Sequence, residues 1–140
     1  LEHLLKYKRK EDEIVVQCDQ GNTTGNVYEV LNKYKDKVHI IEFPLNRDFA
    51  SFKNNLKNNC SGEWIFQIDA DEVPDEYLIS TLHAILKENP TTEVFWVPRI
   101  NTVHGITSEH IRKWGWIKDN DGRINFPDFQ CRILQNSPKI

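Results

Sequence analysis

The amino-acid sequence predicts an α/β domain with a mostly parallel sheet and helices on both faces. Short apolar runs typical of buried strands alternate with stretches in which apolar residues recur at helical spacing. The resulting β-α-β-α-β-α-β order places a crossover helix between successive strands, as parallel sheets require. With 140 residues and a formal net charge of −3, the chain is long enough for one domain with its own core.

The expected strands are short apolar runs, at residues 13–18, 38–43, 64–68 and 93–97. The run at 64–68 is apolar at almost every position, which is typical of a strand buried on both faces of a sheet. Between the strands, apolar spacing at i, i+3, i+4 and i+7 predicts helices at residues 27–34, 49–56 and 75–87. Pro90 ends the last of these helices, and residues 1–10 also show helical spacing.

The regular alternation stops after Pro98. Residues 99–121 contain Trp114 and Trp116 without a clean period, so we expect loops and short extended pieces there. Two short strands are expected at 124–126 and 129–134, separated by a turn at Pro127 and Asp128.

The most informative feature for function is the acidic segment that follows residues 64–68. Asp69, Asp71 and Glu72 come directly after the expected central strand, whose carboxyl end faces the ligand crevice of an open α/β sheet. Mg²⁺ usually keeps one or two protein carboxylates together with phosphate oxygens and water. The segment therefore predicts a metal-diphosphate site. The alternative, a negatively charged helix start, accounts for Asp75 and Glu76 better than for the earlier carboxylates.

Asp19 ends the first expected strand as Asp69 ends the third, so the two side chains would converge on one crevice of the predicted sheet. The turn after Asp19 also fits a helix entry, because Asp, Asn and Thr cap helices and Gly permits the turn. Both interpretations remain open from the sequence.

Composition and hydropathy exclude several classes of protein. The chain has no basic surplus, so we expect no nucleic-acid partner. Its apolar runs are far shorter than the roughly 18 residues of a membrane span, and residues 1–10 do not resemble a signal peptide. We expect a cytoplasmic protein, and attachment to a membrane periphery in the full-length protein stays open. The three cysteines lack CxxC spacing and are expected to be reduced.

Four motifs in order resemble the family 2 glycosyltransferases with a GT-A fold, in the branch that includes lipopolysaccharide-core glucosyltransferases. They are Asp-Glu-Ile-Val-Val at 12–16, Asp-x-Gly-Asn-Thr-x-Gly at 19–25, Arg-Asp-Phe-Ala-x-x-Lys-Asn at 47–54, and the segment 62–72 that ends in Asp-Ala-Asp-Glu. The later Pro-Asp-Phe-Gln-x-Arg-Ile-Leu at 127–134 is also similar to that branch.

This resemblance implies metal-dependent transfer of a sugar from a nucleoside-diphosphate sugar to a hydroxyl of a glycan, lipid-linked saccharide or other acceptor, with inversion. The cofactor would be Mn²⁺ or Mg²⁺. Residues 1–98 would form the nucleotide-sugar-binding part, and 99–140 the start of an acceptor-side segment of the same domain. The family's central opening strand would precede Leu1, so we expect the Rossmann-like sheet to be incomplete at both ends.

The resemblance also implies roles for individual residues. Asp19 would contact the base or ribose, and Lys53 would lie near the nucleotide. Asp69 and Asp71 match the two acidic positions of the DXD motif, with Asp71 the direct metal ligand and Asp69 closer to the ribose or a metal-bound water. Asp128 is the nominee for catalytic base, with Glu109 weaker and a base beyond residue 140 also open.

Each of these roles has a structural alternative. Lys53 also fits a solvated helix position, and Asp128 fits a turn residue after Pro127. Arg132 suits either a phosphate or a surface ion pair. His104 and His110 are given no role.

Other functions also share parts of this pattern. A sugar nucleotidyltransferase would need a Gly-rich, Arg-containing phosphate loop near its start, and a haloacid-dehalogenase-like phosphatase would carry its Asp-x-Asp on the first strand. A non-catalytic nucleotide-sugar-binding module is the alternative from a different class. Gln20 and Thr24 replace acidic residues common in the family, which leaves the identity of the nucleotide base open.

Overall fold

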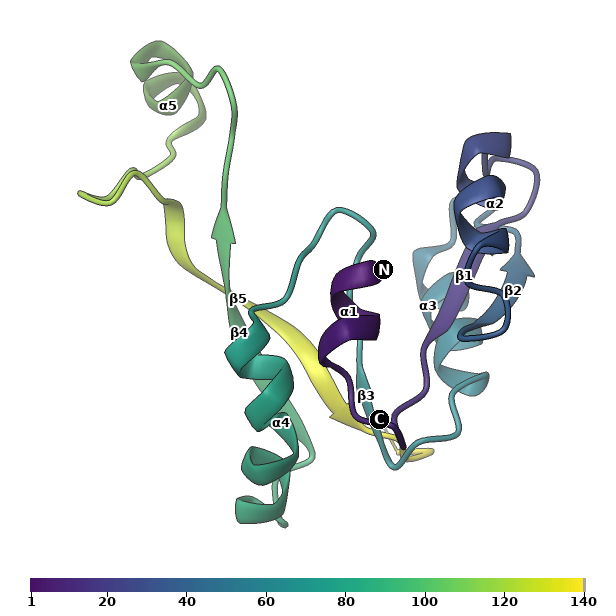
Figure 1. The fold of residues 1–140 in the computed structure, drawn as a ribbon. Coiled ribbons are helices and arrows are strands. Elements are labelled where there is room, and N and C mark those ends of the chain that lie inside the picture. Colours follow the sequence, from purple (N-terminus) through teal and green to yellow (C-terminus); the bar gives the residue numbers. More distant parts are fainter. Residues whose placement is uncertain (140) are drawn as a thin grey trace.

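The computed structural model describes residues 1–139 and is an α/β structure with two separate small sheets (Figure 1). In the first, β1 (Val15–Asp19) and β2 (His39–Phe43) pair in parallel. The second has the order β3-β5-β4, and both of its pairings are antiparallel. Its strands are β3 (Trp64–Phe66), β4 (Val94–Asn101) and β5 (Ile124–Gln135).

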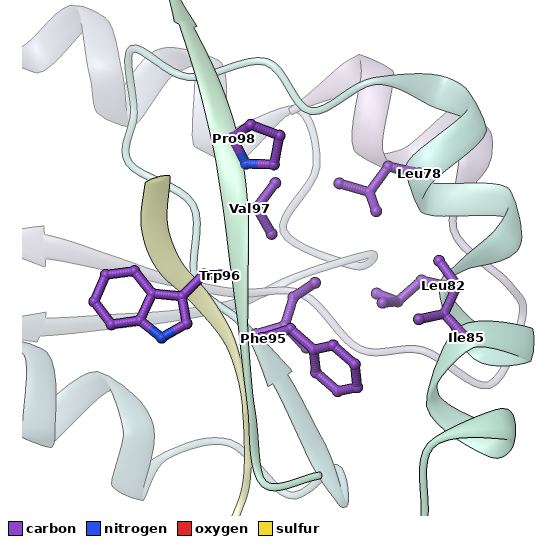
Figure 2. A pocket seen from close by; sticks show the side chains of 8 residues that line it. Leu78, Leu82, Ile85, Phe95, Trp96, Val97 and Pro98 are labelled. Carbon is purple, nitrogen blue, oxygen red and sulfur yellow. The ribbon is translucent and has the colours of Figure 1, made fainter. Parts of the chain in front are cut away.

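The helices follow the apolar spacing of the sequence. They are α1 (Glu2–Tyr7), α2 (Gly25–Asn32), α3 (Phe49–Asn58), α4 (Glu76–Glu88) and α5 (Ser108–Trp114). The carboxylate of Asp75 starts α4 by accepting hydrogen bonds from the backbone N–H groups of Tyr77 and Leu78. Figure 2 shows the apolar side of α4, with Leu78 and Leu82 directed toward β4. A cavity of about 180 Å³ lies between α4 and β4, lined by these side chains and by Phe95 and Val97.

Side chains of α3 connect the two sheets. Gln17 of β1 donates to the carbonyl of Phe52 at 2.7 Å and accepts from Asn55 at 2.7 Å, which fixes α3 against β1. From the same helix, Lys53 forms an ion pair with Asp69, directly beyond β3. The position of α3 therefore brings Lys53 to the acidic segment that follows β3.

The predicted α/β class is confirmed, but the described residues do not form one mostly parallel sheet. Only β1 and β2 are parallel, because β5 inserts between β3 and β4 and pairs antiparallel with both. Ile133 of β5 lies opposite Phe66 and Phe95, and it is one of the most buried side chains, at 2% exposure. β5 is central because a strand pairs with it on each edge, while its residues alternate between exposed and more buried positions along most of its length.

The region beyond Pro98 is more regular than the sequence suggests. Helix α5 forms where loops were expected, and Thr107 and His110 build a capping box at its start. Gly115 ends the helix with a left-handed φ of 65°, which glycine adopts without steric cost. The two short predicted strands are one strand, β5, so the turn predicted at Asp128 is wrong. Asp128 lies in register with Arg99 of β4.

The buried core of the described residues is small. Its buried hydrophobic side chains are Cys18, Leu31, Ile124 and Ile133. All three cysteines are free, as predicted, although Cys131 is exposed. Within residues 1–139, no helix has both the length and the apolar character needed to cross a bilayer.

Candidate functional site

The acidic segment forms a closed turn at the end of β3. The backbone N–H of Glu72 donates to the carbonyl oxygen of Asp69 at 3.0 Å. In return, the backbone N–H of Asp69 donates to Oε2 of Glu72 at 3.1 Å. The two bonds fix the backbone of the Asp-Ala-Asp-Glu segment, and Asp71 lies exposed on the turn. Glu72, to which the sequence assigned no separate role, is therefore a structural part of the site.

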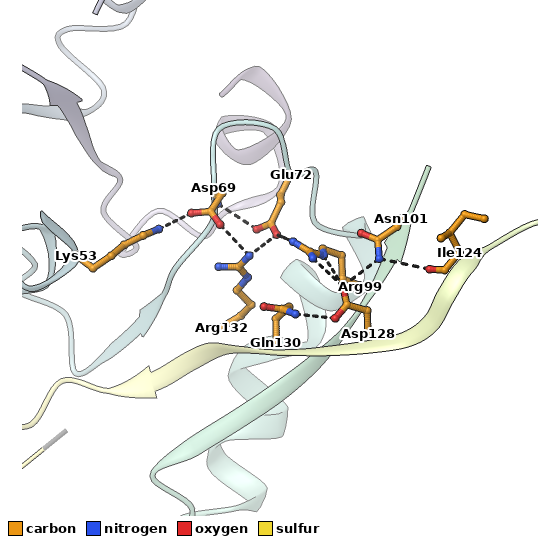
Figure 3. Close-up of polar contacts among 9 residues, drawn as sticks. All are labelled: Lys53, Asp69, Glu72, Arg99, Asn101, Ile124, Asp128, Gln130 and Arg132. Carbon is orange, nitrogen blue, oxygen red and sulfur yellow. Dashed lines mark hydrogen bonds and ion pairs between the residues drawn. The ribbon is translucent and has the colours of Figure 1, made fainter. Parts of the chain in front are cut away.

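Two cations from distant elements hold Asp69. Lys53 of α3 donates to Oδ1 of Asp69, and Arg132 of β5 donates to its Oδ2 at 2.9 Å (Figure 3). Arg132 also forms an ion pair with Oε1 of Glu72. The Arg132 side chain is only 11% exposed, so its ion pair is more buried than the surface pair that was one of its two predicted alternatives. Lys53 is 33% exposed and forms an ion pair, whereas its structural alternative was a solvated helix position.

A second ion pair extends this arrangement along β4 and β5. Arg99 donates to Oε1 of Glu72 at 3.3 Å and, through Nε and Nη2, to Oδ2 of Asp128 at 3.0 and 2.7 Å. Asp128 also accepts from the side chains of Asn101, at 3.0 Å, and Gln130, at 2.7 Å. We call this connected set the polar network; it comprises Lys53, Asp69, Glu72, Arg99, Asn101, Asp128, Gln130 and Arg132 (Figure 3).

The polar network is balanced in charge. Its cations are Lys53, Arg99 and Arg132, and their charges match the three carboxylates that they contact. Partly buried charges are stable when they are paired and hydrogen-bonded in this way. The network therefore keeps the acidic turn in one geometry before any ligand binds.

The surroundings of the two network aspartates lower their pKa values. Burial tends to raise the pKa of Asp69, but the hydrogen bond and charge of Lys53, together with Arg132, outweigh burial and hold that pKa below its usual range. Hydrogen bonds from Asn101, Arg99 and Gln130 lower the pKa of Asp128 to about 2. A general base works best with a pKa near the working pH. The catalytic-base role of Asp128 stays a prediction, and its hydrogen bonds from Arg99 and Asn101 also suit a positioning role.

We expect Asp128 to make the folded state sensitive to acid. Because its pKa is lower in the folded protein than the ordinary value of 3.8, the unfolded chain binds more protons as the pH falls from about 4 to about 2. The stabilisation is complete above that window and is lost within it. Urea unfolding is measured at a series of pH values. Over this range, the urea concentration at the unfolding midpoint should fall less steeply with decreasing pH in Asp128→Asn than in the parent protein. An identical slope in Asp36→Asn and Asp128→Asn would contradict the assignment.

Asp19 lies outside the polar network. Its Oδ1 accepts from the backbone N–H of Leu45 at 2.9 Å, and its Oδ2 accepts from Asn22 at 2.8 Å. These bonds tie the end of β1 to the segment after β2, whereas the N-cap of α2 is Thr24. The turn after Asp19 is therefore a helix entry, as the alternative interpretation proposed, but the residue at its N-cap is Thr24 and not Asp19. The predicted convergence with Asp69 on one sheet edge is absent from the described residues, because β1 and β3 belong to different sheets.

The residues present fit a divalent metal ion that binds together with a diphosphate. Within residues 1–139, Asp71 makes no hydrogen bond or ion pair, and its carboxylate is exposed. Both oxygens of Asp69 are already held by cations. The described residues contain no cluster of three or more His, Cys, Asp or Glu side chains able to hold a metal alone. Mg²⁺ needs no such cluster when phosphate oxygens and water complete its shell.

Sequence reasoning missed the partners that organise the site. Arg99 and Asp128 are 29 residues apart, and Arg132 and Glu72 are 60 residues apart, so no local pattern links them. The signal that could have found the first pair is the antiparallel register of β4 and β5, which brings both residues to the same level. Glu109 lies in the first turn of α5, where its charge suits the helix dipole, and His110 serves in the capping box.

Comparisons with known proteins identify the family of this chain. The profile of the family described as "Glycosyl transferase family 2" matches residues 1–137. A protein of Haemophilus influenzae described as an uncharacterized glycosyltransferase is 28% identical over 98 residues, which cover 67% of this chain and 36% of the relative's length. A search of solved structures found no significant match. Because the profile covers nearly every residue, the chain belongs to glycosyl transferase family 2.

Proposed function

We propose that this chain is the nucleotide-sugar-binding part of a metal-dependent glycosyltransferase. The enzyme transfers a sugar from a nucleoside-diphosphate sugar to an acceptor hydroxyl, with inversion at the anomeric carbon. The observation that carries the proposal is the closed Asp-Ala-Asp-Glu turn, in which Asp71 is exposed and unpaired among the described residues while Asp69 and Glu72 are held by cations. The turn thus offers one carboxylate to a ligand and uses the others to keep its shape.

The proposed division of labour follows from charge. A departing nucleoside diphosphate accumulates negative charge, and a bound Mn²⁺ or Mg²⁺ would offset that charge. Asp71 would hold the metal directly, and Asp69 would act through a metal-bound water or the ribose. Lys53, which is 33% exposed and pairs with Asp69, would lie near the nucleotide. Asp19 would contact the nucleotide from the end of β1.

Acceptor activation needs a carboxylate that can take a proton. Asp128 is held by Arg99, Asn101 and Gln130 and remains ionised far below neutral pH. We therefore propose that the base lies outside the polar network and that Asp128 positions Arg99. Transfer of sugar to an acceptor separates this proposal from a non-catalytic binding module, which would bind the donor but transfer no sugar.

The proposal is tested by thermal unfolding of the intact protein with nucleoside diphosphates and metal. A ligand that binds only the native state adds RT ln(1 + [L]/Kd) to stability, or roughly 2.7 kcal/mol at a hundredfold excess over Kd. We expect one diphosphate with Mn²⁺ or Mg²⁺ to raise the melting temperature by about 2–8 °C. Metal alone and the matching nucleoside monophosphate are the controls and should act weakly. The absence of any shift with UDP, GDP, ADP, CDP or dTDP plus metal would contradict the donor site.

A further inference from the structure

A cavity of about 300 Å³ adjoins the polar network at the end away from Lys53. Arg99, Asn101 and Asp128 belong to both, so whatever fills the cavity lies next to the proposed donor site. The rest of the wall includes Trp116 and Asn125. The volume is at the lower end of the range for ligand pockets, which suits one small ring better than a nucleotide.

The polar wall of the cavity retains hydrogen-bonding capacity. Asn101 donates its amide N–H to Asp128, but its side-chain oxygen accepts nothing from the described residues. Asn125 accepts from the backbone N–H of Ile117 at 2.8 Å, and its amide N–H₂ has no partner within residues 1–139. Adjacent carboxylate and amide groups can bind two neighbouring hydroxyl groups at once, since they combine donors and acceptors at short spacing.

The apolar wall of the cavity is aromatic. Trp116 is half-buried, and its ring lies 4.9 Å from that of Trp114, which in turn stacks on His110 at 4.9 Å. Helix α5 therefore holds Trp116 in place. The flat C–H face of a pyranose ring packs against an aromatic face, through apolar contact and weak C–H interactions.

The charge of the cavity favours a neutral ligand. Arg99 is the cationic side chain of the cavity wall, and its guanidinium group is paired with both Asp128 and Glu72. With its charge neutralised in this way, Arg99 attracts a phosphate weakly, whereas hydroxyl groups can share hydrogen bonds with the ion pair. Phosphate binding would be better served by a metal ion at Asp71, whose carboxylate is exposed and makes no ion pair with the described residues.

We propose that this cavity is a pyranose subsite of the transferase, an inference that rests on the proposed function. The ring is that of either the donor sugar or the acceptor saccharide, which share the same chemistry. Trp116 binds its apolar face, and the side chains of Asn101, Asn125 and Asp128 bind its hydroxyl groups.

The test compares Trp116→Ala with Trp96→Ala in the intact protein. Trp96 is a matched control because it is 64% exposed and lines a different cavity. Calorimetry measures affinity for a nucleoside diphosphate and for its sugar conjugate, and saturation-transfer NMR measures binding of methyl glucoside, galactoside, mannoside and N-acetylglucosaminide. We expect Trp116→Ala to weaken sugar binding about tenfold and to leave diphosphate affinity unchanged, whereas Trp96→Ala changes neither.

The outcomes separate the two sources and the two proposals. Loss of the extra affinity of the sugar conjugate identifies the donor ring, and loss of the methyl glycoside signal alone identifies the acceptor ring. Normal diphosphate binding with no effect of Trp116→Ala on either sugar probe overturns the subsite but not the proposed function. A parent protein that binds no diphosphate overturns the proposed function and the subsite with it. If Trp116→Ala does not fold, Asn125→Gly replaces it, because glycine adopts the φ of 52° found there.

Discussion

Replacement of Asp71 by asparagine is expected to reduce metal-dependent sugar transfer by at least about a hundredfold and to leave the fold unchanged. The loss follows from removal of the charged ligand that stabilises the metal at the departing diphosphate. Asp71 is exposed and has no hydrogen bond or ion pair with the described residues, so the free energy of unfolding should change by less than about 0.5 kcal/mol. Donor turnover with a panel of nucleoside-diphosphate sugars and urea unfolding are measured on the same sample.

Two variants serve as controls for this result. Asp36→Asn makes the same chemical change at an exposed position remote from the acidic segment and should alter neither quantity. Asp69→Asn should lower both, because Asp69 also pairs with Lys53 and Arg132. Transfer by Asp71→Asn at the parental rate would show that Asp71 is not the metal ligand.

The largest loss of stability is expected from Arg132→Met. Arg132 is 11% exposed and neutralises Asp69 and Glu72 from one side, so its removal leaves two carboxylates close together with less compensation. Breaking a fully buried pair costs about 3–5 kcal/mol. Asp69 is 38% exposed, and solvent screening should reduce the loss to about 2–3 kcal/mol. Urea unfolding gives the value directly.

Comparison with a surface pair makes this test specific. Arg9 is 45% exposed and pairs with Asp12, so Arg9→Met should cost less than about 1 kcal/mol. Arg132→Lys keeps the charge but cannot bridge two carboxylates with a planar fork, and we expect an intermediate loss. Equal stabilities of Arg132→Met and Arg9→Met would mean that the polar network does not stabilise the acidic turn.

Local pattern predicted most of the helices and strands up to Pro98, because hydrophobic periodicity records which side of each element is buried. It overlooked α5, although Thr107 and Gly115 carry the cap signals of a helix. Trp114 and Trp116 in that stretch obscure the helical spacing of apolar residues, because they pack on each other beside the cavity.

The sequence by itself determined the family motifs and the acidic segment directly after a buried strand, both of which depend on neighbouring residues. The tertiary structure alone decided that β5 lies between β3 and β4, that Arg99 pairs with Asp128, and that Arg132 bridges Asp69 and Glu72. The physical reason is distance along the chain. Strand register and ion pairs gain their free energy from residues tens of positions apart, and neither hydrophobic period nor turn chemistry records which distant partner a side chain will meet.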